Sequence, residues 1–206
     1  MMSEPKTRSS TVRRAAPGIL HWTLLDDRIK VRSDAYGVVT NGKTVLIDPL
    51  PLLERVLPSL GAVEAICLTG SCHQRSAWRY RDLFGVKVHA PRGAQNLEDR
   101  PDVWYARGDR LPGGLRAIHA PGPTEAHYAF HLPRGRGTLF CSDALVHFGR
   151  SIRFIDNRYQ DNPMLTRRSV ERLLKLPFAT LCFNHGSPLL HGAKAAIRAA
   201  FRAEAG

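Results

Sequence analysis

The stretch Ile66–Trp78 reads ICLTGSCHQRSAW, and the rest of the chain can be organised around it. The apolar run Ala65–Leu68 is broken by Thr69-Gly70-Ser71. An amphipathic pattern then runs from Ser76 to Phe84 and ends at Gly85. This order predicts a strand, a loop and a helix. In an open α/β fold such a loop lies at the carboxyl end of a strand, where binding sites gather.

The loop carries four side chains with chemistry: Cys72, His73, Gln74 and Arg75. Cys72 and His73 form a candidate pair of metal ligands, because thiolate sulfur and imidazole nitrogen both bind zinc. Alternatively, Arg75 and the free amides at the start of the helix form an anion site. A surface loop without chemistry is the third interpretation, and the loop alone does not choose among them.

The length and the cysteine usage indicate one cytoplasmic domain. A chain of 206 residues buries a substantial core without disulfides. The four cysteines show no CxxC spacing, and three lie in or beside apolar runs: Cys67, Cys141 and Cys182. This usage predicts buried free thiols in a reducing compartment. No apolar segment approaches the about 18 residues of a membrane span, and no signal peptide is evident. We therefore expect a cytoplasmic protein that does not enter a membrane.

The chain is basic, with a formal net charge of +12, which raises the question of a nucleic-acid partner. The arginines are spread along the sequence and are adjacent only at Arg13-Arg14 and Arg167-Arg168. Aromatic residues do not alternate with them in an RNA-reading pattern. A diffusely basic surface is the favoured interpretation, although the charge does not exclude nucleic acid.

The order of patterns along the chain predicts an alternation of strands and helices. Residues 1–16 are polar, basic and without periodicity, which predicts a disordered tail before a single domain over 17–206. Asn41-Gly42 separates two β-rich runs and predicts a tight hairpin, because both residues tolerate positive φ. Further strands are expected at 19–24, 29–31, 35–40, 44–47, 87–90, 115–119, 128–132, 138–141 and 180–183. Further helices are expected at 52–60, 93–96, 165–176 and 192–203.

Polar residues follow several of these strands, and their order resembles the metallo-β-lactamase superfamily. The matching pieces lie between Ala35 and Ala203 and include Tyr36-Gly37-Val38-Val39, Val45-Leu46-Ile47-Asp48-Pro49, Leu68-Thr69, Ala120-Pro121-Gly122, Phe140-Cys141-Ser142-Asp143-Ala144 and Asn184-His185-Gly186. Each piece alone is weak, but their shared order is specific. The resemblance implies an α/β fold, the αβ/βα four-layer sandwich, with a metal site along the strand ends.

The chain departs from the superfamily at most metal-ligand positions. The first metal motif of the superfamily, Thr-His-x-His-x-Asp-His, corresponds to Thr69–Arg75, where all four ligand positions are changed. Pro123 replaces the histidine of the Pro-Gly-His-Thr turn. Asp143 matches the bridging aspartate, and His185 matches the last histidine. The resemblance also implies that Asp48, next to Thr69, has a structural role beside the site.

A reduced metal site is the first functional hypothesis. A catalytic zinc, or another divalent ion, needs three protein ligands and an open position. Asp143, His185 and either Cys72 or His73 supply such a set. The resemblance implies hydrolysis of an ester, thioester or lactone carbonyl. In this hypothesis Asp143, His185 and His73 are the catalytic residues. Arg75 then binds a carboxylate or phosphate of the substrate, because its planar guanidinium matches such groups.

Other functions stay open if no metal binds. Arg75 then pairs with Asp143, because an uncompensated buried carboxylate is costly. Another alternative is a non-catalytic relative whose pocket binds an anionic small molecule through Arg75. Purely structural roles for Cys72 and His73 belong to the same alternative. A nucleic-acid-binding member of the superfamily is the last hypothesis. The substrate and the oligomeric state do not follow from the sequence.

Overall fold

The first half of the chain forms a mixed sheet of seven strands in the computed structural model, which describes residues 4–149 and 151–205. The strands follow in sequence order: β1 (Arg13–Ala16), β2 (Ile19–Asp26), β3 (Val31–Thr40), β4 (Lys43–Ile47), β5 (Ala62–Cys67), β6 (Lys87–Pro91) and β7 (Val103–Tyr105). Pairing is antiparallel from β1 to β4 and parallel from β4 to β7. Asn41 and Gly42 between β3 and β4 have φ angles of 51° and 75°, which confirms the expected tight hairpin.

The second half forms a four-stranded sheet in the order β13-β10-β9-β8 and a separate two-stranded ribbon, β11-β12. The strands are β8 (Arg116–His119), β9 (Tyr128–Leu132), β10 (Thr138–Phe140), β11 (Leu145–Phe148), β12 (Ser151–Phe154) and β13 (Thr180–Cys182). The α-helices are α1 (Ala77–Phe84), α2 (Pro163–Leu173) and α3 (Ala193–Ala205). Short 3-10 segments are η1 (Glu54–Leu60), η2 (Ser71–His73), η3 (Pro112–Gly114), η4 (Ser142–Ala144) and η5 (Asn157–Tyr159).

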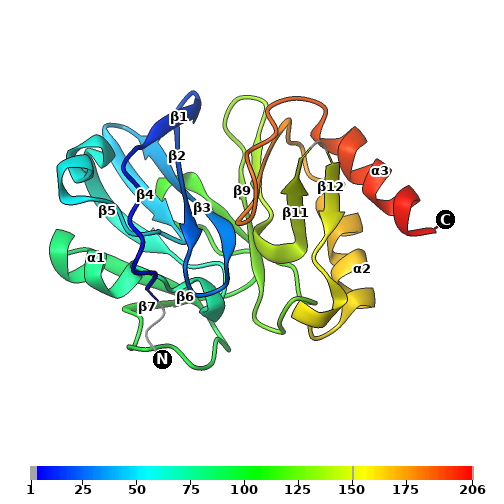
Figure 1. The fold of residues 1–206 in the computed structure, drawn as a ribbon, viewed down its shortest axis with the longest axis horizontal. Coiled ribbons are helices and arrows are strands. Elements are labelled where there is room, and N and C mark those ends of the chain that lie inside the picture. Colours follow the sequence, from blue (N-terminus) through cyan, green and yellow to red (C-terminus); the bar gives the residue numbers. More distant parts are fainter. Residues whose placement is uncertain (1–3, 150, 206) are drawn as a thin grey trace.

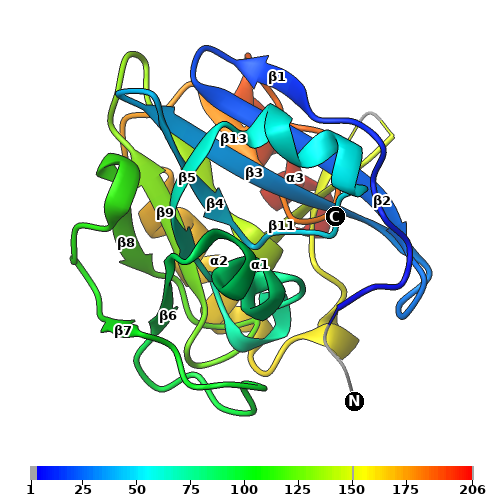
Figure 2. The same ribbon diagram turned by 90° about the vertical axis from the view of Figure 1, so that its left-hand side faces the viewer.

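The two large sheets pack face to face, and helices cover their outer faces (Figures 1 and 2). Along β4, Val45 and Ile47 belong to the core between the sheets, whereas Leu46 packs in the layer that contains Tyr80 of α1. This alternation follows from the two-residue period of a strand. Leu139 of β10 packs with α2 and α3 on the other outer face. The result is the αβ/βα four-layer sandwich that the resemblance implies.

The amino-terminal segment corrects the expectation of a disordered tail over residues 1–16. From residue 4 onward the chain lies against the first sheet. The backbone of Ser9 pairs beside Leu52, and the next residues form the edge strand β1. Glu4 Oε1 accepts a hydrogen bond from Ser76 Oγ at 2.7 Å. A sheet edge offers free N–H and C=O groups that pair with a polar segment as well as an apolar one. Residues 1–3 lie outside the described residues.

Other local expectations also differ from the structure. Residues 93–96 form turns and bends rather than a helix. Strand β7 and the ribbon β11-β12 were not expected, because their runs are short. The helix expected at 165–176 begins earlier, at Pro163, where Asn162 Oδ1 accepts from the Leu165 amide at 3.0 Å. Among the residues described, no helix combines the length and the apolar character needed to cross a membrane.

Candidate metal centre

Four strand ends meet at one edge of the sandwich and bring their polar residues together. Asp48 follows β4, Thr69 lies just after β5, Ser142 follows β10 and Asn184 follows β13. Thr69 Oγ1 lies 2.8 Å from Ser142 Oγ, and Asn184 Nδ2 donates to Asp48 Oδ2 at 2.7 Å. These bonds join the first sheet to the second. The site therefore lies where the carboxyl ends of parallel strands gather.

Asp48 is the buried hub of this network. Its carboxylate accepts hydrogen bonds from the Thr69 amide at 2.8 Å and from Thr69 Oγ1 at 2.6 Å, in addition to the bond from Asn184. The side chain is fully buried, and the residue has a φ of 46°, in the left-handed region. A buried carboxylate needs such donors, since an unpaired charge would be costly. These bonds suit a structural role for Asp48 and Thr69 beside the site.

His73 lies between this hub and Asp143. Its Nδ1 is 3.0 Å from Thr69 Oγ1 and 3.2 Å from Ser142 Oγ, and its Nε2 is 3.0 Å from Asp143 Oδ2. Burial by itself lowers the pKa of His73, but the charge of Asp143, together with smaller contributions from Cys72, Asp48 and the hydrogen bond between Asp143 and the ring, holds that pKa well above its ordinary value. His73 in return holds the pKa of Asp143 well below its usual range, against the effect of burial. Without a metal the two residues form an ion pair.

His185 presents a lone pair to the other oxygen of Asp143. Its Nδ1 lies 2.9 Å from the carbonyl oxygen of Arg32, which only accepts, so Nδ1 carries the proton. Burial lowers the pKa of His185, which leaves the ring neutral with a free lone pair on Nε2. That atom lies 3.6 Å from Asp143 Oδ1, and Oδ1 is buried without a hydrogen-bond partner among the described residues. Two acceptors that face each other in this way fit a cation between them.

Cys72 completes a set of donors that fits one metal ion. Cys72 is exposed, and its Sγ, a ring nitrogen of His73 and a carboxylate oxygen of Asp143 all lie within 4.8 Å of one another. Thiolate, imidazole and carboxylate are the ligands of tetrahedral zinc sites. The buried oxygen of Asp143 that lacks a partner supports the fit, and His185 Nε2 beside it is the fourth donor.

The remaining family positions do not fit a second ion. Gly70 and Pro123 carry no donor side chain. The Gln74 side-chain oxygen accepts from Trp78 Nε1 at 2.8 Å and from the Glu98 amide at 2.7 Å. His127 is also engaged. Its Nδ1 lies 2.7 Å from the Ala120 carbonyl oxygen, and its Nε2 accepts from the Asp143 amide at 3.2 Å. The residues present therefore suit one ion rather than two.

Arg75 lies elsewhere than its expected roles require. The side chain is 3% exposed, and its guanidinium donates to the backbone oxygens of Asp34 at 2.9 Å and Asp48 at 3.1 Å. The ion pair of Asp143 with His73 supplies the positive charge that the alternative assigned to Arg75. Burial also disfavours Arg75 as the group that binds substrate.

The site contains residues that the sequence reasoning did not single out: Ser142, Asn184, Asp34 and the Arg32 carbonyl. Ser142 and Asn184 each directly precede a predicted site residue, Asp143 or His185, and this adjacency was the available signal. The remaining cysteines follow expectation, since Cys67, Cys141 and Cys182 are buried and free.

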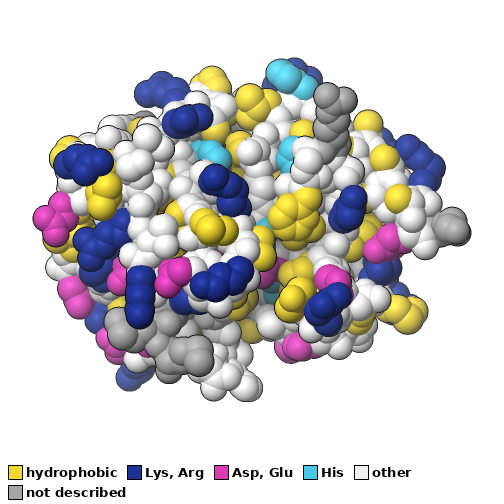
Figure 3. Space-filling view, in the orientation of Figure 1, with side chains coloured by type: hydrophobic (Ala, Val, Ile, Leu, Met, Phe, Trp, Pro, Cys, Tyr) yellow, Lys and Arg dark blue, Asp and Glu magenta, His cyan; other side chains and the backbone are white. Residues whose placement is uncertain are grey.

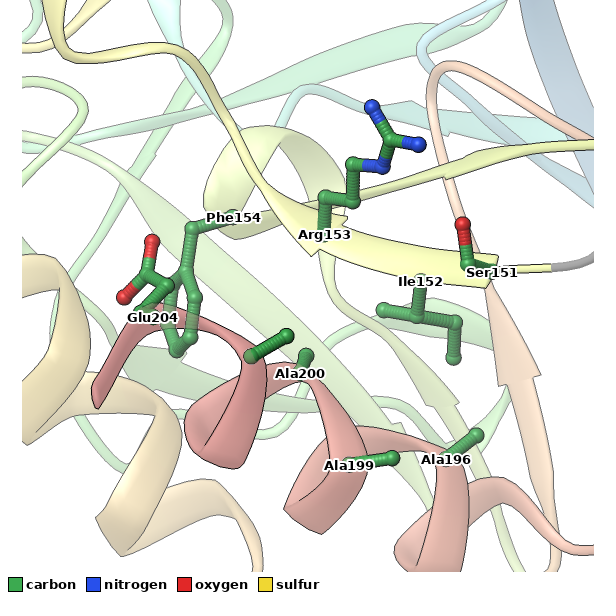
Figure 4. Close-up of a pocket in the computed structure, with 9 residues that line it drawn as sticks. Ser151, Ile152, Arg153, Phe154, Ala196, Ala199, Ala200 and Glu204 are labelled. Carbon is green, nitrogen blue, oxygen red and sulfur yellow. The ribbon is translucent and has the colours of Figure 1, made fainter. Parts of the chain in front are cut away.

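A groove of about 620 Å³ opens between β12 and α3 (Figure 4). Alanines of α3 line one wall, and Ile152 and Phe154 line the other. Glu204 at its end forms an ion pair with Arg167 at 2.7 Å. None of the candidate ligands lines this groove, so we do not assign the chemistry to it.

Comparison with known sequences supports the family. Residues 12–176 match the family model described as metallo-beta-lactamase superfamily. A hydroxyacylglutathione hydrolase of Aeromonas salmonicida (strain A449) is 30% identical over 142 residues, which make up 66% of this chain and 52% of that protein. The chain thus spans about half the length of this relative.

Solved structures share the fold. DIM-1 metallo-beta-lactamase has a TM-score of 0.73 at 14% identity, with 94% of this chain and 98% of that chain covered. A metallo-beta-lactamase family protein from Thermus thermophilus has a TM-score of 0.68 at 16% identity, over 93% and 81% of the two chains. The protein TTHA1623, solved in a di-iron-bound form, has a TM-score of 0.64 at 25% identity, over 80% and 93%. The chain therefore belongs to the metallo-beta-lactamase superfamily, as a divergent member with most of the expected metal-ligand positions substituted.

Proposed function

We propose that this protein is a hydrolase that uses one divalent metal ion, zinc in the first instance, to cleave an ester, thioester or lactone carbonyl. The observation that carries the proposal is the meeting of donor atoms from Cys72, His73 and Asp143 within 4.8 Å. His185 Nε2, which lies 3.6 Å from Asp143 Oδ1, adds a fourth donor. Sulfur, nitrogen and carboxylate donors in one cluster favour zinc over magnesium or calcium.

The residues of the chain define how the site would work. A bound ion supplies Lewis acidity and lowers the pKa of a neighbouring water. Thr69 and Ser142 orient His73 through Nδ1 and leave Nε2 directed at the cluster. Asp143 stays ionised, because its pKa is depressed. Cys72 is the exposed member, so substrate approaches from its side.

The named relative favours a thioester as the first substrate to test. Hydroxyacylglutathione, in the name of the Aeromonas protein, is a thioester of glutathione. The match covers about half of that protein, so the reaction class is a better guide than the particular substrate. A panel of acyl-glutathione thioesters, aryl esters and lactones covers the class.

A binding protein without catalysis is the second candidate, and the His73–Asp143 ion pair favours it. An imidazolium 3.0 Å from the carboxylate neutralises Asp143 without a metal. The pocket would then bind a small anion without a metal. Nucleic acid remains the third candidate. The Lys and Arg side chains on the face shown in Figure 3 are dispersed among other side chains, which does not favour a continuous phosphate-binding stripe.

Metal content tests the first candidate against the second. The protein is purified without a metal-binding tag, incubated with zinc, desalted and analysed for metals. We expect close to one zinc per chain, and a loss of zinc in Asp143→Ala and Cys72→Ser. The exposed His191→Gln serves as a matched control that keeps its zinc. Absence of metal from the wild type after zinc incubation would remove the metal hydrolase and leave the binding protein.

Activity is measured next. We expect the zinc-loaded wild type and His191→Gln to hydrolyse at least one compound of the panel. Asp143→Ala should hydrolyse none. If zinc binds and no member of the panel is turned over, the substrate class is wrong while the metal site stands. Binding to DNA or RNA that weakens steeply with salt would favour the third candidate.

A further inference from the structure

Three alternate residues of β3 hold the segment that carries His185. Tyr36 Oη donates to the Phe183 carbonyl at 2.9 Å and accepts from the Phe183 amide at 3.2 Å. The Asp34 amide donates to the Asn184 carbonyl at 2.8 Å. The Arg32 carbonyl accepts from His185 Nδ1 at 2.9 Å. One strand of the first sheet therefore sets the path of residues 183–186, which follow β13 in the second sheet.

Asp34 contributes its side chain as well as its backbone. Oδ2 accepts from the Gly186 amide at 2.7 Å, and Oδ1 lies 2.6 Å from His21 Nε2. The Asp34 side chain is 3% exposed, so both oxygens depend on these partners. The His21 ring stacks on Tyr36 with ring centroids 5.1 Å apart. His21 is thereby fixed where it supports the carboxylate.

This arrangement determines which nitrogen of His185 is free. The ring keeps its proton on Nδ1 only while it stays against the Arg32 carbonyl. Asp34 holds the next residue, Gly186, and so keeps the ring in that place. We propose that Asp34, supported by His21, is a positioning residue that fixes the tautomer of His185 and directs its Nε2 lone pair toward Asp143. The proposal rests on the proposed function only in taking His185 as a ligand.

The tautomer is measured by nitrogen NMR on 15N-labelled protein without metal. The two ring nitrogens of His185, assigned with His185→Gln, should give separate signals of a fixed Nδ1–H tautomer in the wild type. In Asp34→Ala they should move toward the average of the two tautomers. Asp34→Asn should restore the wild-type pattern, because the amide oxygen still accepts from Gly186. Unchanged signals in Asp34→Ala would overturn the proposal.

Thr23→Val is the matched control. It removes one hydrogen bond from the same pair of strands, that of Thr23 Oγ1 to the Ser33 carbonyl at 2.9 Å, without touching residues 183–186. A change at His185 as large as that in Asp34→Ala would show general loosening of the hairpin and reject a specific role. If Asp34→Ala does not fold, hydrogen exchange in the wild type decides. A protected Gly186 amide supports the proposal, and an amide that exchanges as fast as in an unfolded chain rejects it.

A second readout links the positioning to the metal. Cobalt, which reports its ligands by its visible spectrum, should bind about tenfold more weakly to Asp34→Ala than to the wild type, with recovery in Asp34→Asn. Equal affinity in Asp34→Ala would reject the functional consequence. A wild type that binds no cobalt would remove the proposed function, while the tautomer result would still decide the role of Asp34.

Discussion

His73 and Asp143 form an ion pair between the two halves of the molecule, with Nε2 and Oδ2 separated by 3.0 Å. His73 stands after β5 of the first sheet, and Asp143 stands after β10 of the second. Asp143 raises the pKa of His73, and His73 lowers the pKa of Asp143. Both shifts favour the charged forms of the two groups. The charge state of the site is therefore tied to the contact between the sheets.

Stability of the metal-free protein should fall as pH rises because of His73. Its folded pKa is raised above the unfolded value near 6.5, so its contribution is complete below about pH 6.5. The contribution is lost as pH rises through the folded pKa. Urea unfolding at several pH values from neutral upward should show this decline in the wild type and a flatter profile in His73→Gln. Equal slopes in the two proteins would contradict the prediction.

His127 should act in the opposite pH range. Burial lowers its pKa to about 4, so the unfolded chain takes up this proton first as pH falls. Stability is then lost between about pH 6.5 and pH 4, by up to about 3 kcal/mol. His127→Gln preserves a donor and an acceptor but does not titrate. We expect the difference in unfolding free energy between wild type and variant to shrink on acidification, and a constant difference would count against this account.

Asp48→Asn should destabilise the protein by about 2–4 kcal/mol, because it removes the charge at the hub and turns a donor toward Thr69 or Asn184. Chemical denaturation measures the loss. Asp82→Asn is the control, since Asp82 is 72% exposed in its ion pair with Arg81. That change should stay within about 0.5 kcal/mol. Similar losses of unfolding free energy in both variants would mean that the buried hydrogen bonds of Asp48 contribute no more to stability than the exposed ion pair of Asp82.

Gly186→Ala should be costly for a local reason. Gly186 has a φ of 118°, and an added Cβ would lie 2.0 Å from the His147 carbonyl oxygen. We expect a loss above about 2 kcal/mol and weaker metal binding, because the segment of His185 must move. Gly135→Ala is the control, with a φ of 61° and open space around the added carbon. It should cost about 1 kcal/mol and leave metal binding intact. Equal effects of the two changes would exclude the steric explanation.

The architecture was predictable because its signals are local and repeated. The Asn41-Gly42 hairpin and the apolar alternation of the strands follow from backbone preference and burial. The positions of Asp143 and His185 at strand ends followed from the order of strands. Short strands such as β7 and β11 carry too few residues for a periodic signal. The amino-terminal segment is ordered by backbone pairing, which composition does not report.

The direction of the loop side chains was not predictable. The loop tightens into the 3-10 segment η2, which turns His73 inward and leaves Cys72 exposed. Arg75 has a φ of 39° and directs its guanidinium to backbone oxygens inside the protein. The winding of this short segment decides which of these side chains meets Asp143. Residue types alone do not contain that information.

The bond from Asn184 to Asp48 joins positions 136 residues apart, and this separation has a consequence for folding. Contacts that are so distant in the chain slow folding, because closing the long loop between them costs conformational entropy. The site is therefore complete only once the two sheets have docked. An ion held by Cys72 on one side and His185 on the other would act as a crosslink between the halves, so its binding would oppose their separation.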